Sequence, residues 1–176
     1  KPEISKELQD EVCKKFVDIY DNDKIECIFD PDVKFSRWRK LVYNACLNPL
    51  CALLELDVGR LEIFGATDSI VRASMREVLA IAKSEGVDLP EDIMEFMIRS
   101  DDPHYYKPSM QVDVEKGNYI ENEVILGNPV RIAKKNGVAA PILSLMYELL
   151  KVVQCKIKEK KGSIVVPKDR PVPASE

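Results

Sequence analysis

The chain has 176 residues and a formal net charge of −4. Its hydrophobic fraction of 45% and charged fraction of 32% are those of an ordinary globular protein and exclude wholesale disorder. The negative charge argues against a protein that binds nucleic acid by neutralising phosphates. No apolar run approaches the ~20 residues that span a bilayer. We therefore expect a soluble protein that binds neither nucleic acid nor membrane.

Glycine and cysteine usage narrows the possible chemistry. The seven glycines lie at least six residues apart, so the sequence contains neither of the phosphate-binding motifs G-x-G-x-x-G and G-x-x-x-x-G-K-[ST]. The five cysteines form no C-x-x-C pair, and the sole histidine, His104, has no cysteine near it. This pattern argues against a disulfide framework and a metal site, and it favours reduced core thiols in a cytoplasmic protein. We expect His104 at the surface.

The first part of the chain predicts a helix and then a strand. Apolar residues at helical spacing predict an amphipathic helix over residues 4–20. Residues 25–29 alternate with a period of two, which predicts a short strand. A lone strand lacks partners for its backbone groups. Either it pairs with another copy, or its sheet lies outside this chain.

The remaining segments predict helices alone. Their spacing and caps place helices over residues 38–56, 68–85, 90–97, 108–117 and 120–136, with a last helix from Pro141. Residues 163–176 hold three prolines and little that could pack, so we expect a flexible tail. The predicted fold is an all-α bundle of about six helices with one short N-terminal strand.

One predicted helix carries a line of polar residues that does not suit a core. Lys40, Asn44 and Asn48 follow at intervals of four in an otherwise apolar stretch, so a continuous helix would place them on one face. Burying such groups costs energy unless they are paired. The line is therefore either a satisfied polar seam between two helices or a binding site for a polar ligand, with the lysine as proton donor. Pro49 would kink a helix that continues through it.

A second polar group lies downstream. Ser109 follows Pro108 at a predicted helix start, where free backbone N–H groups suit a carboxylate. Asp113 lies four residues further on the same face, and Glu121 lies near the start of the next helix. Each also has a structural interpretation: a helix cap for Ser109, and solvated acids for Asp113 and Glu121.

The two groups together resemble ketopantoate reductase (2-dehydropantoate 2-reductase). The resemblance rests on Lys40-x3-Asn44-x3-Asn48-Pro49 and on Pro108-Ser109-Met110-Gln111-x-Asp113 with Glu121 eight residues later. It covers roughly residues 34–160 and the C-terminal, substrate-side domain of that family, a helical bundle like that of 6-phosphogluconate dehydrogenase. The resemblance implies a preceding nucleotide-binding domain, absent here, with NADPH in the cleft between the domains.

On this resemblance the chain divides into three parts. Residues 1–33 would be the closing helix and strand of the absent domain, residues 34–162 the substrate and catalytic domain, and residues 163–176 the tail. The partners implied are the protein's own N-terminal domain, a small anionic 2-keto acid and a second copy in a homodimer. The activity implied is reduction of ketopantoate to pantoate in pantothenate synthesis, with this fragment alone inactive.

The resemblance also implies a role for each site residue. Lys40 would be the general acid, and Glu121 would help to position it and the substrate. Asn44 and Asn48 would bind substrate oxygens, Ser109 would bind the carboxylate, and Asp113 matches the motif as a substrate-side residue. The sequence departs from the family after Glu121, where it reads Glu-Val-Ile-Leu-Gly with Pro129 inside the predicted helix. A different 2-keto acid as substrate and a non-catalytic helical interaction or dimerisation module stay open as alternatives.

Overall fold

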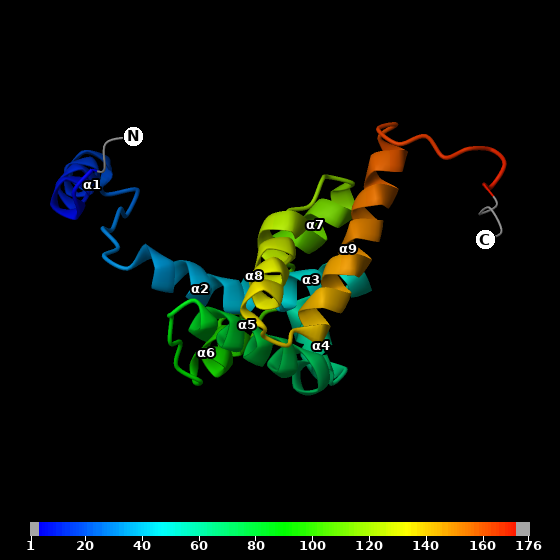
Figure 1. Ribbon diagram of the computed structural model, residues 1–176, viewed down its shortest axis with the longest axis horizontal. Helices are drawn as coiled ribbons and strands as arrows, with labels where there is room; N and C mark the ends of the chain where they lie inside the picture. Colours follow the sequence, from blue (N-terminus) through cyan, green and yellow to red (C-terminus); the bar gives the residue numbers. More distant parts are fainter. Residues whose placement is uncertain (1–3, 172–176) are drawn as a thin grey trace. The chain divides into compact units, whose positions relative to one another are not determined.

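The computed structural model describes residues 4–171. Among these residues the chain forms α-helices and two π-helical turns (η1 and η2) and no β-sheet, so the predicted all-α class is confirmed (Figure 1). In chain order the elements are α1 (Lys6–Tyr20), α2 (Val33–Asn44), α3 (Leu47–Leu54), α4 (Val58–Ile63), η1 (Thr67–Val71), α5 (Arg72–Ser84), α6 (Ile93–Arg99), α7 (Ser109–Lys116), η2 (Glu123–Gly127), α8 (Asn128–Asn136) and α9 (Pro141–Lys160).

The described chain consists of two compact units, residues 4–37 and 38–171, with the boundary inside α2. In the smaller unit α1 is capped by Ser5, whose hydroxyl accepts a hydrogen bond from the backbone N–H of Leu8 at 3.3 Å. None of its residues is buried. Lys14 lies 5.2 Å from the ring centroid of Phe29, so the segment after α1 folds back on the helix.

The strand predicted over residues 25–29 is not formed. A single bridge between Asn22 and Ile25 is the extent of pairing in the described chain. Instead, the side chain of Asp21 accepts a hydrogen bond from the backbone N–H of Cys27 at 2.8 Å, and that of Asn22 accepts one from Lys24 at 3.0 Å. These local bonds replace the ladder that a lone strand could not make.

The larger unit is built around helix contacts that bring distant segments together. α3 packs against α7 and α9, α5 packs against α8 and α9, and α8 packs against α9 (Figure 1). Fully buried apolar side chains at the centre of this unit come from several helices: Val42, Leu61, Met75, Val78, Ile81, Leu126, Leu143 and Leu150. None of the described helices is both long enough and apolar enough to span a membrane.

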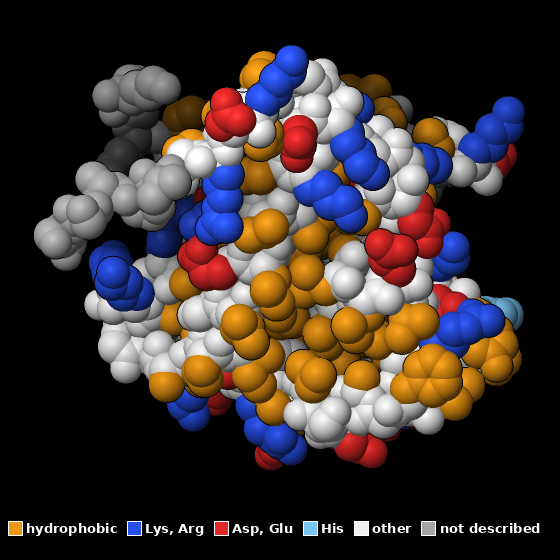
Figure 2. Space-filling view, turned by 90° about the vertical axis from the view of Figure 1, so that its right-hand side faces the viewer, with side chains coloured by type: hydrophobic (Ala, Val, Ile, Leu, Met, Phe, Trp, Pro, Cys, Tyr) orange, Lys and Arg blue, Asp and Glu red, His pale blue; other side chains and the backbone are white. Residues whose placement is uncertain are grey.

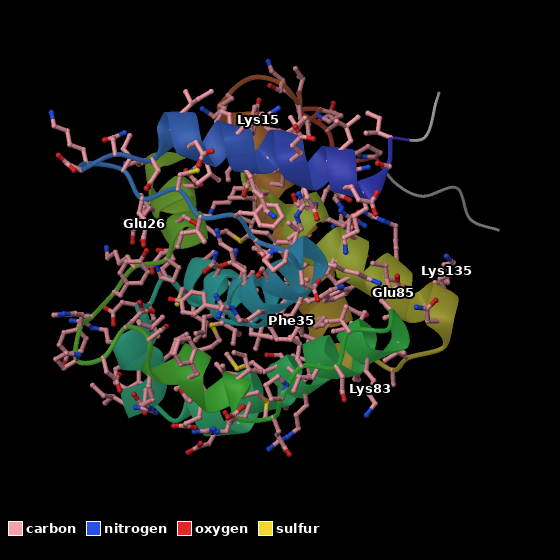
Figure 3. All side chains as sticks on the ribbon, turned by 90° about the vertical axis from the view of Figure 1, so that its left-hand side faces the viewer. Lys15, Glu26, Phe35, Lys83, Glu85 and Lys135 are labelled. Carbon is pink, nitrogen blue, oxygen red and sulfur yellow. The ribbon has the colours of Figure 1, made fainter. Side chains whose placement is uncertain are left out.

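Caps fix two of these contacts. The carboxylate of Glu77 on α5 accepts hydrogen bonds from the backbone N–H groups of Ile142 and Leu143 at 3.0 and 2.9 Å, which caps the N-terminus of α9. Just after the C-terminal end of α5, the side chain of Asn136 donates to the carboxylate of Glu85 at 2.6 Å. Figure 3 shows this end of α5, with Lys83 and Glu85, beside the end of α8 that carries Lys135.

Several predicted boundaries are confirmed and others are not. The helix predicted over 90–97 is α6, which begins at Ile93 and not at Pro90. α7 ends before Gly117 and α8 before Gly137, both left-handed as expected of glycine caps, and α9 begins at Pro141. The long helix predicted over 38–56 is broken, and α4 forms where an interruption was expected. The helix predicted over 120–136 is present over residues 122–136 without interruption, but its first part is the π-helical turn η2, and Pro129 is the second residue of α8.

The chain after α9 is exposed and non-helical over residues 162–171. Its first residues are held, because the backbone N–H of Ser163 donates to Lys158 at 2.8 Å and the hydroxyls of Ser163 and Tyr119 lie 2.9 Å apart. The rest of the predicted tail, residues 172–176, lies outside the described residues, as do residues 1–3. The expected division into domains at residues 33 and 162 stays a prediction.

Candidate active site

Lys40 lies on the open side of α2. The helix begins after Asp32, whose carboxylate accepts a hydrogen bond from the backbone N–H of Phe35 at 3.0 Å. Trp38 and Val42 are the buried residues of α2, one turn apart. Lys40 lies midway between them in sequence, about 200° around the helix from each, and is therefore exposed. Its amine makes no hydrogen bond or ion pair within the described chain.

Asn44 and Asn48 lie on either side of a break. α2 ends at Asn44, which is half-buried. The backbone N–H of Cys46 then bonds to Tyr43, three residues back, at 3.2 Å, and α3 starts at Leu47. The expectation of one continuous helix through Pro49 is therefore wrong. Residues 45–46 separate α2 from α3, so Pro49 lies in the first turn of α3, where its missing N–H breaks no helical hydrogen bond.

Asn48 carries the clearest anomaly of the structure. Its side chain is 3% exposed, yet its carboxamide oxygen has no hydrogen-bond partner among the described residues. Buried polar atoms are normally satisfied, and an orphan costs about 1–3 kcal/mol. The satisfied polar seam that the sequence left open as an alternative is thus not what the described residues form around Asn48.

α7 brings a second predicted group to α3. Ser109 is the first residue of α7 and is exposed, while Pro108 occupies the cap position without a side-chain bond. The N–H groups of the first turn therefore lack a side-chain cap. Asp113 is half-buried and accepts a hydrogen bond from Asn118 at 3.2 Å, so it also holds the C-terminal end of α7. Because α3 packs against α7, Asn48 and the Ser109 helix belong to one packed pair.

Glu121 precedes the η2 turn and is exposed. Its backbone carbonyl accepts a hydrogen bond from Ile125 at 3.0 Å, whereas its carboxylate has no bond within the described chain. The structure therefore leaves the Lys40 amine and the Glu121 carboxylate open to solvent. Neither of two cavities in the larger unit, one beside Leu47 and Thr67 and one beside Arg76 and Leu79, is lined by the predicted site residues.

Two features of the same helices were not predicted. Tyr43, one turn after Lys40, donates its hydroxyl hydrogen to the carboxylate of Asp101, in the segment between α6 and α7. Burial, together with this hydrogen bond, raises the pKa of Tyr43 well above its usual range. The second is Gln111 on α7, which is 1% exposed and has an unpartnered carboxamide oxygen like that of Asn48.

Gln111 is held by a small surface network. Its amide nitrogen donates to Glu115 at 3.0 Å, and Lys107 donates to the same carboxylate at 2.9 Å. The Lys107 ammonium lowers the pKa of Glu115 below its ordinary value. Gln111 stands within the Ser109 motif of the sequence, but its burial and its unpartnered oxygen are visible only in the structure.

The other candidate groups in the sequence carry no site. His104 is exposed, as expected. All five cysteines are free thiols; Cys46 and Cys51 are buried core residues, whereas Cys13 and Cys155 are exposed, so the expectation that every cysteine fills the core is wrong. Within residues 4–171 no group of three or more His, Cys, Asp or Glu side chains is placed to hold a metal ion.

Comparison with known proteins identifies the family. Residues 32–154 match the family model described as "Ketopantoate reductase PanE/ApbA C terminal". An uncharacterised Saccharomyces cerevisiae protein, YDL144C, is 48% identical over 153 residues, which cover 84% of this chain and 43% of the relative. A 2-dehydropantoate 2-reductase from Nostoc is 33% identical over 68% of this chain and 38% of the enzyme.

Solved structures agree. The crystal structure of 2-dehydropantoate 2-reductase from Methylococcus capsulatus aligns with a TM-score of 0.76 and 37% identity, over 84% of this chain and 47% of that one. D-mandelate dehydrogenase, solved with NADH and anilino(oxo)acetate, aligns with a TM-score of 0.78 at 24% identity, over 84% of this chain and 63% of that one. A dimeric ketopantoate reductase from Staphylococcus aureus aligns with a TM-score of 0.75 at 21% identity, over 83% of this chain and 52% of that one. The last two identities establish the fold alone.

These matches define the class as an all-helical domain of an oxidoreductase family. The chain belongs to the ketopantoate reductase family, of which it is a C-terminal domain. It spans less than half the length of the yeast and Nostoc relatives.

Proposed function

We propose that this chain is the catalytic and substrate-binding half of an NADPH-dependent reductase that converts 2-dehydropantoate to pantoate in pantothenate synthesis. The single observation that carries the proposal is the buried, unpartnered carboxamide oxygen of Asn48, next to a helix with an exposed, unpaired lysine. A buried polar atom without a partner calls for an explanation, and a ligand that completes its bonding is the one proposed for Asn48. Family membership supplies the reaction class.

The residues suit a small anion that carries hydroxyl and ketone oxygens. The Asn48 oxygen is closed to solvent in this chain, so in the proposal its side chain turns to accept a hydrogen bond from a substrate hydroxyl, and the Asn44 amide donates to a substrate oxygen. The uncapped first turn of α7 and the Ser109 hydroxyl provide donors for the carboxylate. The Lys40 ammonium adds the attraction of a positive charge.

Lys40 performs the acid step in this proposal. A bound reduced nicotinamide would supply hydride to the ketone carbon, and the Lys40 ammonium would give a proton to the ketone oxygen. Glu121 holds the ammonium and the substrate in position. Asp113 acts as a positioning residue, because it secures α7 through Asn118. The sequence has no glycine-rich phosphate loop, so we assign the binding of NADPH mainly to another half of the protein.

That other half is an N-terminal nucleotide-binding domain, and α1 supports its existence. Apolar residues run along α1 at helical spacing, and each is strongly exposed: Leu8, Val12, Phe16 and Ile19. An amphipathic helix that buries none of its residues normally packs its apolar stripe against another surface. We propose that residues 1–33 close the absent domain, and that the cleft between the domains completes the site around Lys40.

The proposal includes cytoplasmic location and a homodimer, and it predicts no turnover from this chain alone. The test is to mix the full-length protein with NADPH and 2-dehydropantoate and to follow the absorbance of the reduced nicotinamide. A panel of other 2-keto acids, including aromatic ones, and a parallel series with NADH determine substrate and cofactor choice. Absence of turnover with every substrate and both cofactors would reject the reductase in favour of a non-catalytic interaction module.

A further inference from the structure

α9 has apolar side chains on two faces, whose centres are about 120° apart around the helix. One face carries the helix's buried residues, Leu143, Met146, Leu150 and Ile157. The second face carries Leu145, Leu149 and Val152, which are 62%, 46% and 68% exposed. Intervals of four and three place these three side chains in one stripe along the helix. A helix with two apolar faces buries one in its own domain and leaves the other for a partner.

The exposed stripe, Leu145–Leu149–Val152, belongs to a broader apolar surface. Figure 2 views the side of the molecule on which α9 lies in Figure 1, and it shows hydrophobic side chains gathered in one patch with charged side chains around it. Leu54 at the C-terminal end of α3, which packs against α9, is also exposed, at 49%. Contiguous apolar surface of this kind marks an interaction site, whereas single exposed apolar residues do not.

The order of residues along the stripe is self-complementary. When two copies of α9 cross antiparallel about a two-fold axis at Leu149, the two Leu149 side chains meet, and Leu145 of each copy lies within one residue along the helix of the level of Val152 of the other. On the flank of the stripe, Glu148 and Lys151 form an ion pair at 2.8 Å within one chain. The same two-fold brings Glu148 to within one residue along the helix of the level of Lys151 of the second copy, on the same flank, so charges of opposite sign lie near each other.

We propose that the Leu145–Leu149–Val152 stripe of α9 is the isologous interface through which two copies of this protein form a homodimer. The inference rests on the homodimer in the proposed function and names its surface. A second copy fits better than the absent N-terminal domain, because that domain already has the stripe of α1 to cover and has no need of a two-fold pattern. The charge pairing also fixes the antiparallel direction.

The test compares oligomeric state and activity in the full-length protein. We expect a wild-type dimer by sedimentation equilibrium, and we expect Leu149→Glu to weaken it at least 100-fold, because like charges then meet at the two-fold. Phe96→Glu on α6 is the matched control, since Phe96 is an apolar residue of similar exposure, 63%, outside the stripe. It should leave the dimer unchanged.

A crosslink keeps the proposal testable if Leu149→Glu fails to fold. Leu149→Cys in a Cys155→Ser background should form a disulfide-linked dimer on mild oxidation, and Phe96→Cys in the same background should not. A wild-type protein that is monomeric overturns both the homodimer and the interface. A dimer that survives Leu149→Glu and gives no crosslink overturns the interface alone. Reductase activity, measured on the same samples, tests the proposed reaction separately.

Discussion

The Tyr43 hydroxyl donates a hydrogen bond to the Asp101 carboxylate and so joins two segments that are 58 residues apart. Tyr43 lies one turn after Lys40 on α2, and Asp101 begins the segment that leads to Ser109 on α7. The bond therefore ties the helix of the proposed acid to the segment of the proposed carboxylate site.

Removal of this hydroxyl should destabilise the fold. Tyr43→Phe keeps the ring but leaves the Asp101 carboxylate without its donor, and we expect the free energy of unfolding to fall by about 1–2 kcal/mol in urea titrations. Tyr105→Phe is the control, because the Tyr105 hydroxyl has no hydrogen-bond partner in the described chain and the side chain is 60% exposed. Equal stabilities of the two variants would show that the Tyr43 bond contributes nothing.

The same bond predicts a dependence on alkaline pH. The pKa of Tyr43 is raised in the folded state, so folding favours the neutral phenol. This contribution is complete below the unfolded pKa of about 10 and is lost as the pH rises above it. The difference in stability between the wild type and Tyr43→Phe should therefore shrink above pH ~10. A difference that grows with pH in that range would contradict this assignment.

Glu77 should be the cap on which the position of α9 depends. Glu77→Ala removes both acceptors for Ile142 and Leu143, and we expect a loss of about 1–2 kcal/mol in the free energy of unfolding. Glu91→Ala, at an exposed acid whose side chain makes no bond in the described residues, should change stability little. Hydrogen exchange of the first turn of α9 should accelerate in the Glu77 variant, and unchanged protection there would count against the cap.

Substitution of Asn48 should impair substrate binding without a large loss of stability. Asn48→Ala removes an unpartnered buried oxygen, so we expect little loss of stability, within about 1 kcal/mol, while KM for the substrate rises at least tenfold. Asn136→Ala provides the opposite case, because Asn136 bonds to Ser84 and Glu85 and should lose stability without a change in KM. A large loss of stability in Asn48→Ala with normal KM would mark Asn48 as purely structural.

Much of the fold could be predicted from local signals. The glycines after α7 and α8 and the proline that opens α9 mark helix ends by backbone geometry alone, and the structure confirms them. The strand predicted over residues 25–29 was wrong. An alternating apolar pattern describes side chains only, whereas here the side chains of Asp21 and Asn22 accept hydrogen bonds from the nearby backbone N–H groups. The break before α3 was missed because the apolar pattern runs through it without interruption.

The candidate site was predicted in part. Residue types and spacing singled out Lys40, Asn44, Asn48 and Ser109, and the structure leaves Lys40 and Ser109 exposed. The roles of these residues stay predictions. The hydrogen bond between Tyr43 and Asp101 could not be predicted, because the two residues are far apart in sequence. The unpartnered oxygen of Asn48 could not be predicted either, because whether a buried atom finds a hydrogen-bond partner depends on every neighbour that tertiary packing brings to it.

The turnover number of Lys40→Ala in the full-length enzyme tests the central claim most directly. The control is Arg39→Ala, which removes an exposed cation from the neighbouring position of α2 and leaves the proposed acid in place. With circular dichroism and NADPH affinity unchanged, we expect kcat for 2-dehydropantoate to fall at least 100-fold in Lys40→Ala and by less than twofold in Arg39→Ala. A Lys40→Ala enzyme that turns over at the wild-type rate would contradict the account.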